Sequence, residues 1–153
     1  MSATDSNKLK FYSSTYRHGV DEKRRVQIPA KWRPEETEVE LTLILWPNGQ
    51  QGFCLRVLPP REMAALMAKI QSMPSADPEA VALRRNIARD SDQVTIDKAG
   101  RICIPEQMAQ AAGIEKEAVL AGALQWFEIW NPDRHAAASD ADAVLSPEAL
   151  KKI

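Results

Sequence analysis

The chain of 153 residues has few of the side chains that enzymes use for catalysis. Its only histidines are His18 and His135, which lie far in sequence from either cysteine. It lacks the GxGxxG and Walker A loops that hold phosphates, the HExxH helix that holds zinc, and any paired CxxC. The sequence therefore argues against an enzyme, and we expect no cofactor, no metal site and no small-molecule substrate.

Cysteines and long apolar runs are also scarce. Cys54 and Cys103 lie in strand-like runs without a CxxC spacing, so we expect both to be buried, reduced thiols of a cytoplasmic protein. No run approaches the ~18 apolar residues of a membrane span. Residues 1–10 are polar and lack the apolar stretch of a signal peptide. We expect this N-terminus to be flexible and the protein to have no membrane partner.

One motif, by contrast, is present twice. An Asp is followed by three residues, an Arg, two residues and Ile-Pro, first within 20–29 and again within 96–105, at an offset of 76 positions. Beyond each copy an apolar run leads to an aromatic strand, 52–55 and 126–129, where the sequence indicates an offset of 74. This period is far longer than that of solenoid or propeller repeats. We infer an internal duplication, two copies of a small domain that pack on or through each other because each alone could bury little surface.

The net charge is only −1, but the charges are segregated along the chain. Residues 8–33 hold eight basic and two acidic side chains, whereas residues 35–40 hold four glutamates and no basic side chain. Such segregation concentrates attraction for a polyanion on one face. Because the basic run coincides with the first copy of the motif, we interpret it as a binding surface rather than as an ordinary solvated face.

The remaining pattern favours a mainly β fold with short helices, of the α+β class. Apolar runs predict strands at 39–45, 53–57, 94–96, 101–104, 119–121 and 127–130. Caps, prolines and apolar spacing predict helices at 61–71, 77–90 and 105–113. The apolar stripe of the first helix, which includes Met67, and Leu83 of the second helix are expected to face the core.

The same pass divides the chain into segments. They are a first domain (11–72), a helical connection (73–93), a second domain (94–135) and a tail (136–153). The tail has few large apolar residues, so it can bury little surface. We expect it to be disordered, or at most a frayed helix that begins at Ser146.

Each copy of the motif predicts a tight turn after its Asp. Asp21 and Asp97 are expected to be structural, since an Asp at this position usually accepts hydrogen bonds from backbone N–H groups of the turn. Gly100 is expected to supply the positive φ that such turns often require.

The element Asp97–Pro105 resembles the signature of AbrB-like swapped-hairpin DNA-binding domains. Two such elements, followed by the Phe-Glu-Ile-Trp run 127–130, resemble the MraZ family over roughly Tyr16–Arg134. The resemblance implies that two half-domains form an internal pseudo-dimer barrel and that subunits assemble into rings, commonly of eight. It also implies a cytoplasmic, nucleoid-associated regulator of transcription. Such a regulator binds double-stranded DNA at direct repeats in the promoter of its own division and cell-wall gene cluster.

The resemblance also assigns residues to the DNA interface. It implies that Arg25 is the main DNA contact and that Arg101 is its repeat counterpart. Around them, the basic side chains of the two turns and Arg17, from the basic run before the first turn, complete the candidate set, which is Arg25, Arg24, Lys23, Arg101, Lys98 and Arg17.

Arg24 departs from the family pattern, because it occupies the place that Gly100 holds in the second copy. If this position needs a positive φ, a residue with a side chain costs ~1–2 kcal/mol. Either the first turn has another shape, or the strain is accepted because Arg24 adds a DNA contact. The denser basic tip at Lys23–Arg25 favours the first turn as the principal contact.

Two other functions remain open. An AbrB-like antitoxin would use a tail to wrap a toxin, although such proteins usually have one domain and a longer apolar tail. An assembly protein that does not bind DNA could instead pair the basic turns with the 35–40 glutamates of another subunit.

Overall fold

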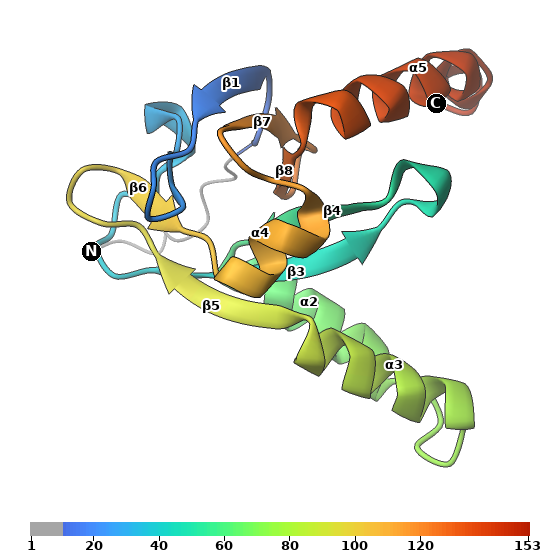
Figure 1. Ribbon diagram of the computed structural model, residues 1–153. Coiled ribbons are helices and arrows are strands. Elements are labelled where there is room, and N and C mark those ends of the chain that lie inside the picture. The colour runs from blue at the N-terminus through green and yellow to red at the C-terminus, as the bar shows by residue number, and fades with distance from the viewer. Residues whose placement is uncertain (1–10) are drawn as a thin grey trace.

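The computed structural model describes residues 11–153, so the expected flexibility of residues 1–10 lies outside the described part of the chain. Eight strands and four α-helices make up this part (Figure 1). The strands are β1 (Thr15–Gly19), β2 (Arg25–Gln27), β3 (Glu40–Pro47), β4 (Phe53–Leu58), β5 (Ser91–Thr95), β6 (Arg101–Cys103), β7 (Glu117–Gly122) and β8 (Phe127–Trp130). The helices are α2 (Pro60–Gln71), α3 (Pro78–Arg89), α4 (Glu106–Ala112) and α5 (Pro132–Leu150), with short 3-10 turns at η1 (Ala30–Trp32) and η2 (Gly49–Gln51).

The predicted α+β class is confirmed, with more helix than expected. Strands β1 and β2 fall outside the predicted strands, because both runs are short and rich in polar or charged residues. Local propensity gives little signal for strands of this kind, whose pairing partners lie far away in the sequence.

Six strands form one antiparallel sheet in the order β1-β7-β8-β4-β3-β5, and β2 pairs with β6 in a separate two-stranded ladder. The expected closed barrel is not seen, because β1 and β5 end the sheet and, within residues 11–153, each pairs with a single strand of it. The turn after each of these strands leads the chain into β2 or β6, which then pair with each other. The two copies of the motif therefore meet in the ladder, apart from the main sheet.

Corresponding strands of the two halves pair in the same register. In the ladder, Val26 lies opposite its own repeat counterpart, Ile102. In the middle of the sheet, Arg56 of β4 lies opposite Glu128 of β8. Arg56 and Glu128 are therefore counterparts, and β4 corresponds to β8 at an offset of 72 positions. Pro60 and Pro132, which begin α2 and α5, are separated by the same 72 positions. The sequence-based offset of 74 is wrong by two residues, because a slip of two preserves the alternation of side chains between the faces of a strand.

The core lies between one face of the sheet and the ladder. Side chains of the sheet pack there with Val26 and Ile102 of the ladder, all of them at most 2% exposed; those of the sheet include Leu41, Leu43, Leu55, Leu120 and Ile129. Aromatic rings complete this cluster: the Trp32 and Phe127 ring centroids are 4.9 Å apart, and those of Tyr12 and Phe127 are 5.3 Å apart. Burial of this apolar surface fixes the ladder to the sheet and so positions the two motif turns.

Helices α2 and α5 flank the sheet at two ends of the molecule (Figure 1). Helix α5 covers a second, small cluster that includes Val119, Ala121 and Trp130. Near the centre of the sheet, the Arg56 guanidinium carbon lies 3.7 Å from the Trp46 ring centroid and 4.5 Å from that of Trp126. Its Nε is 3.6 Å from Oε2 of Glu128.

The predicted helix ends are confirmed at two places. The Asp77 side chain accepts a hydrogen bond of 3.0 Å from the Glu79 N–H at the start of α3. Gly113 closes α4 with a φ of 68°. The expected burial of Met67 and Leu83 is wrong, since they are 49% and 38% exposed. The two helices form a hairpin that projects from the sheet (Figure 1), and within them only Ile70 and Ala80, on either side of the connecting loop, are buried.

The expected disorder of residues 136–153 is wrong as well. Helix α5 runs without a break through Ser146 to Leu150, and its N-cap Asn131 accepts a hydrogen bond of 3.0 Å from the Arg134 N–H. The tail is rich in Ala, which has the highest helix propensity, so the lack of large apolar residues does not prevent a capped helix. Among the described residues, no helix combines the length and the apolar character needed to cross a membrane.

The two cysteines differ in exposure, which corrects the prediction that both are buried. Cys54 is fully buried in the small cluster under α5, whereas Cys103 is exposed on the outer face of the ladder. Strand alternation gives the reason, because Ile102 and Ile104 on either side of Cys103 both point into the core.

This difference predicts selective thiol labelling. Burial raises the pKa of the Cys54 thiol to about 12, so its thiolate is almost absent at neutral pH. We expect the native protein to react with one equivalent of a thiol reagent such as DTNB, and with a second only after unfolding. The Cys103→Ser variant should show no fast reaction. Rapid reaction of Cys54 in that variant would contradict its burial.

Candidate nucleic-acid interface

The two motif turns are built in the same way. In the first, Asp21 Oδ1 accepts hydrogen bonds from the backbone N–H groups of Lys23 at 3.0 Å and Arg25 at 2.8 Å. Its Oδ2 accepts a third from Nε of the Arg25 side chain at 2.7 Å. The carboxylate thus fixes both the turn and the arginine that ends it, as expected for an Asp in this position.

The second turn repeats these contacts. Asp97 Oδ1 accepts hydrogen bonds from the backbone N–H groups of Ala99 and Arg101, each at 2.9 Å, and Oδ2 accepts from Arg101 Nε at 3.1 Å. In both turns the motif spacing follows from this geometry, since the carboxylate reaches the N–H groups two and four residues ahead of it.

The residue before each arginine has a left-handed backbone conformation. Gly100 has a φ of 83°, as predicted, and Arg24 has a φ of 62°. The first turn therefore has the same shape as the second, and Arg24 adopts a conformation that L-residues with a Cβ rarely take.

The ladder places both arginines on one surface. Val26 and Ile102 point into the core, so their neighbours Arg25, Gln27, Arg101 and Cys103 share the outer face. Arg25 and Arg101 lie on a diagonal of this face, with 34% and 31% of their side chains exposed. Arg101 Nη1 is also 4.0 Å from Asp21 Oδ2, so one carboxylate lies near both guanidinium groups.

A shallow hollow of about 360 Å³ lies next to this face. It is lined by Gly19, Val20, Asp21, Arg25, Gln27 and Arg101. The hollow therefore joins the first turn to the arginine of the second, and a phosphate or a base edge could enter it.

Two residues that sequence reasoning missed connect the turns to each other. The Gln27 side-chain amide donates a hydrogen bond of 2.9 Å to the Ala99 carbonyl, and the Cys103 thiol lies 3.2 Å from the Lys23 carbonyl. Gln27 and Cys103 are repeat counterparts, as are Lys23 and Ala99, so the same cross-link occurs twice with different donors. The fixed offset of 76 positions marks these residues as counterparts in the sequence. That they connect the two turns follows only from the pairing of β2 with β6.

The other predicted interface residues are placed in different ways. Lys23 and Lys98 are exposed in the two turns. Arg17 lies on β1, where its Nη2 is 3.0 Å from Oε1 of Glu117 on β7, so the structure does not join it to the ladder face. Arg24 turns away from that face and donates a hydrogen bond of 2.9 Å from Nε to the Ile104 carbonyl.

Both turn carboxyls have a lowered pKa. The chief cause is the hydrogen bond from the backbone N–H of the arginine, Arg25 for Asp21 and Arg101 for Asp97, and the positive guanidinium group adds to it. Both carboxylates therefore stay ionised at neutral pH. Across residues 11–153, no group of three or more His, Cys, Asp or Glu side chains is arranged to hold a metal ion.

Comparison with known proteins identifies relatives over most of the chain. A family model described as MraZ protein, antitoxin-like, matches residues 87–150. The protein named transcriptional regulator MraZ from Herpetosiphon aurantiacus is 36% identical over 139 residues, which cover 90% of this chain and 93% of the relative. Proteins of the same name from Clostridium tetani and Thermomicrobium roseum are 34% and 30% identical, covering 83% and 90% of this chain and 86% and 94% of the relatives.

The lowered pKa of Asp21 and Asp97 predicts a loss of stability in acid. A folded-state pKa below the unfolded value of ~3.9 adds stability that is complete above that value and is lost as the pH falls through the folded value. We expect calorimetry between about pH 5 and pH 2 to show a steeper fall in Tm for the wild type than for Asp21→Asn/Asp97→Asn. Parallel curves would mean that neither carboxylate stabilises its turn.

Proposed function

Because the chain belongs to the MraZ family, whose relatives named above are transcriptional regulators, we propose that it regulates transcription by binding promoter DNA through the outer face of the β2–β6 ladder. The observation that carries this proposal is the pair of guanidinium groups, Arg25 and Arg101, held on one exposed face by two equivalent carboxylates. Its target is double-stranded DNA with direct repeats upstream of its own gene cluster, at the nucleoid.

The chemistry of arginine supports this role. Each Asp binds the Nε of its arginine, which leaves the two terminal nitrogens of the guanidinium as the groups that can grip phosphate oxygens or guanine O6 and N7. A side chain already held in one conformation loses less entropy on binding. The major groove also admits a two-stranded β-ribbon, which is the form of this ladder.

Lys23 and Lys98 add charge beside the two arginines. Their flexible ammonium groups suit phosphate contacts, which give affinity without sequence preference. The first turn is the more basic of the two, and we propose that it makes the principal contact. Arg17 forms an ion pair with Glu117 across β1 and β7, so we do not count it among the principal DNA contacts.

The interleaved strands support the swapped-hairpin arrangement that the sequence implied. β2 of the first half pairs with β6 of the second, and β1 and β5 each pair with a strand of the other half. We propose that the single chain is an internal pseudo-dimer, which would present two turns to one DNA site.

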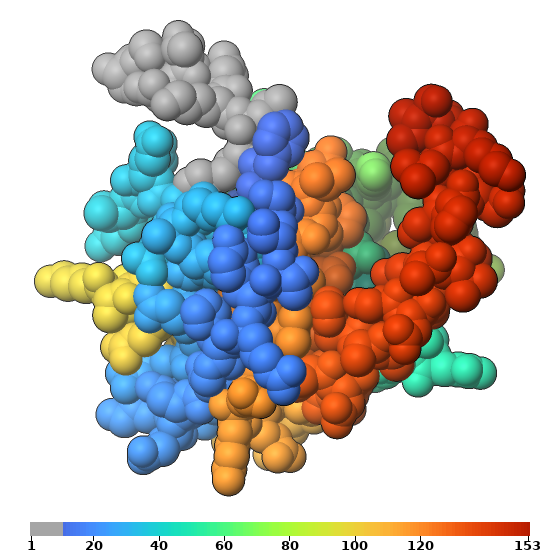
Figure 2. All heavy atoms as spheres, turned by 90° about the horizontal axis from the view of Figure 1, so that it is seen from above, coloured from blue at the N-terminus to red at the C-terminus, as the bar shows by residue number. Residues whose placement is uncertain are grey.

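Self-association is the second part of the proposal. The far half of α5 stands out from the rest of the surface (Figure 2) and exposes Val144 at 77% and Leu145 at 69%. Its acidic residues Asp140 and Asp142 complement the basic side chains Arg85 and Arg89 of α3, on the projecting hairpin where Leu83 is exposed. A head-to-tail contact of α5 with the α2–α3 hairpin of the next copy would generate a ring.

A ring would repeat the ladder face and raise affinity for repeated DNA sites through multivalency. The rival assembly function would use the same arginines differently, in ion pairs with the 35–40 glutamates of a neighbouring copy. Both functions predict an oligomer, so only the behaviour of arginine variants separates them.

DNA binding should depend strongly on Arg25. We expect Arg25→Ala to weaken binding to a duplex from its own upstream region by about 1–3 kcal/mol per contact, and the salt slope to shrink by about 0.9 for each phosphate that the variant no longer neutralises. Fluorescence anisotropy between 50 and 200 mM salt measures both.

Arg61→Ala is the matched control, because Arg61 is an exposed arginine on α2 and belongs to neither motif turn nor the ladder. The Arg25→Glu variant should bind no DNA yet keep its oligomeric mass in light scattering. Loss of the oligomer in that variant would favour the assembly function, and unchanged DNA binding by Arg25→Ala would reject the proposed contact.

The far half of α5 should control oligomeric mass. We expect Leu145→Glu to lower the mass measured by multi-angle light scattering, because it places a charge on the exposed apolar stripe. Ala143→Glu adds the same charge to the opposite side of the helix and should leave the mass unchanged. Equal masses for both variants and the wild type would exclude this contact.

A further inference from the structure

We propose that Arg24 is a positioning residue of the first turn, rather than a DNA contact, and that Arg33, which belongs to the same half of the chain, has the matching role at the second turn. Residues 24 and 104 are hydrogen-bonded in both directions. The Ile104 N–H donates to the Arg24 carbonyl at 2.9 Å, and Arg24 Nε donates back to the Ile104 carbonyl at 2.9 Å. The side chain therefore ties the turn to the end of β6.

The second turn reaches the same arrangement with a different residue. The Ile28 N–H donates to the Gly100 carbonyl at 2.9 Å, which repeats the backbone bond. The Ile28 carbonyl, however, accepts its guanidinium bond from Arg33 Nε, also at 2.9 Å. At the repeat offset of 76, Gly100 is the counterpart of Arg24, and Ala109 is the counterpart of Arg33.

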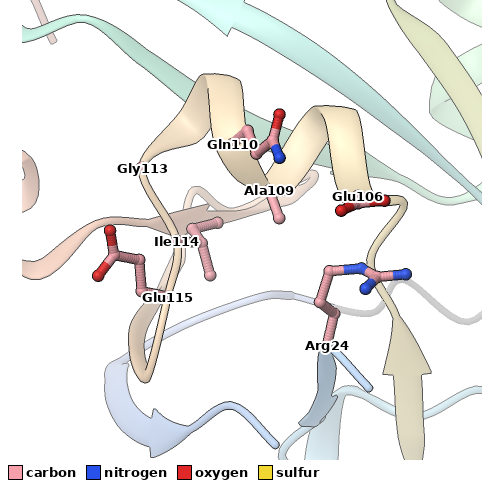
Figure 3. Close-up of a pocket in the computed structure, with 7 residues that line it drawn as sticks. All are labelled: Arg24, Glu106, Ala109, Gln110, Gly113, Ile114 and Glu115. Atoms are coloured by element: carbon pink, nitrogen blue, oxygen red, sulfur yellow. The ribbon is translucent and has the colours of Figure 1, made fainter. Parts of the chain in front are cut away.

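The two solutions exclude each other sterically. A Cβ built at Gly100 would overlap the Arg33 guanidinium, so the second turn has no room for a side chain at this position while Arg33 is present. At the first turn, alanine stands at the counterpart of Arg33, and Arg24 makes the guanidinium bond instead. Arg24 and Ala109 line a hollow of about 310 Å³, and the Arg24 guanidinium reaches toward Glu106 at the start of α4 (Figure 3).

The Ile28 and Ile104 carbonyls, which directly precede Pro29 and Pro105, therefore each accept one guanidinium hydrogen bond. Both isoleucines are fully buried, so a carbonyl that lost its donor would be costly to leave unpaired. The bond from Arg24 to the Ile104 carbonyl therefore offsets the cost of the left-handed backbone at Arg24.

Moving the arginine from position 24 to position 109 tests the proposal, because the effect of Ala109→Arg on the Tm should change sign with the residue at position 24. Ala109→Arg should lower the Tm in the wild type, where Arg24 already donates to the Ile104 carbonyl and would repel a second guanidinium beside it. In the Arg24→Gly background it should raise the Tm, because it restores the missing donor. The double variant Arg24→Gly/Ala109→Arg keeps the net charge of the wild type. The reciprocal set at the second turn is Gly100→Arg in the wild type and in Arg33→Ala, and it should show the same reversal. If the added arginine lowers the Tm in both backgrounds in both sets, the proposal is wrong.

The DNA part rests on the proposed function and has its own measurement. Anisotropy with the upstream duplex should give the double variant Arg24→Gly/Ala109→Arg the affinity and salt slope of the wild type, while Arg24→Ala binds several-fold more weakly with an unchanged slope. A slope smaller by about 0.9 in both variants would make Arg24 a phosphate contact and overturn the positioning role. If the wild type itself does not bind the duplex, the proposed function fails, and the unfolding measurements still decide the positioning roles.

Discussion

Neither half of this chain can satisfy its own backbone hydrogen bonds, and the rest of the structure depends on that constraint. Within residues 11–153, β1, β2 and β5 form ladders only with strands of the other half, and β4 and β8 pair across the centre. An exposed row of unpaired N–H and C=O groups is a liability for any sheet, so each half stabilises the other. The motif turns take their positions from this interleaving, because they connect the edge strands to the ladder.

The turns themselves could be predicted, because their geometry is local. An Asp that accepts hydrogen bonds from the N–H groups two and four residues ahead depends on few distant residues. A glycine directly before the arginine also indicates that this position has a positive φ. Helix ends were predictable for the same reason, as at Asp77 and Gly113. Strands β1 and β2 were not, since their polar runs are held by partners about a hundred and about 76 positions away.

Other errors came from treating composition or pattern as if it determined a single structure. The tail lacks large apolar residues, yet alanines and a good N-cap make it a helix. The offset between β4 and β8 was misread because a slip of two residues leaves the alternation intact. The direction of Arg24 could not be read from the chain at all, since it depends on the space that Ala109 leaves and on a carbonyl 80 residues away.

The pair Arg56 and Glu128 shows what the proposed internal pseudo-dimer permits in a single chain. These residues face each other where the two halves meet, so in a dimer of identical chains the same residue would stand on both sides. Two arginines or two glutamates opposite one another would repel. Each half of one chain can instead carry its own residue, and here an attractive pair lies at this place, with the Arg56 guanidinium over the rings of two tryptophans. The two halves are joined covalently, so neither can separate from the other or lose its complementary partner.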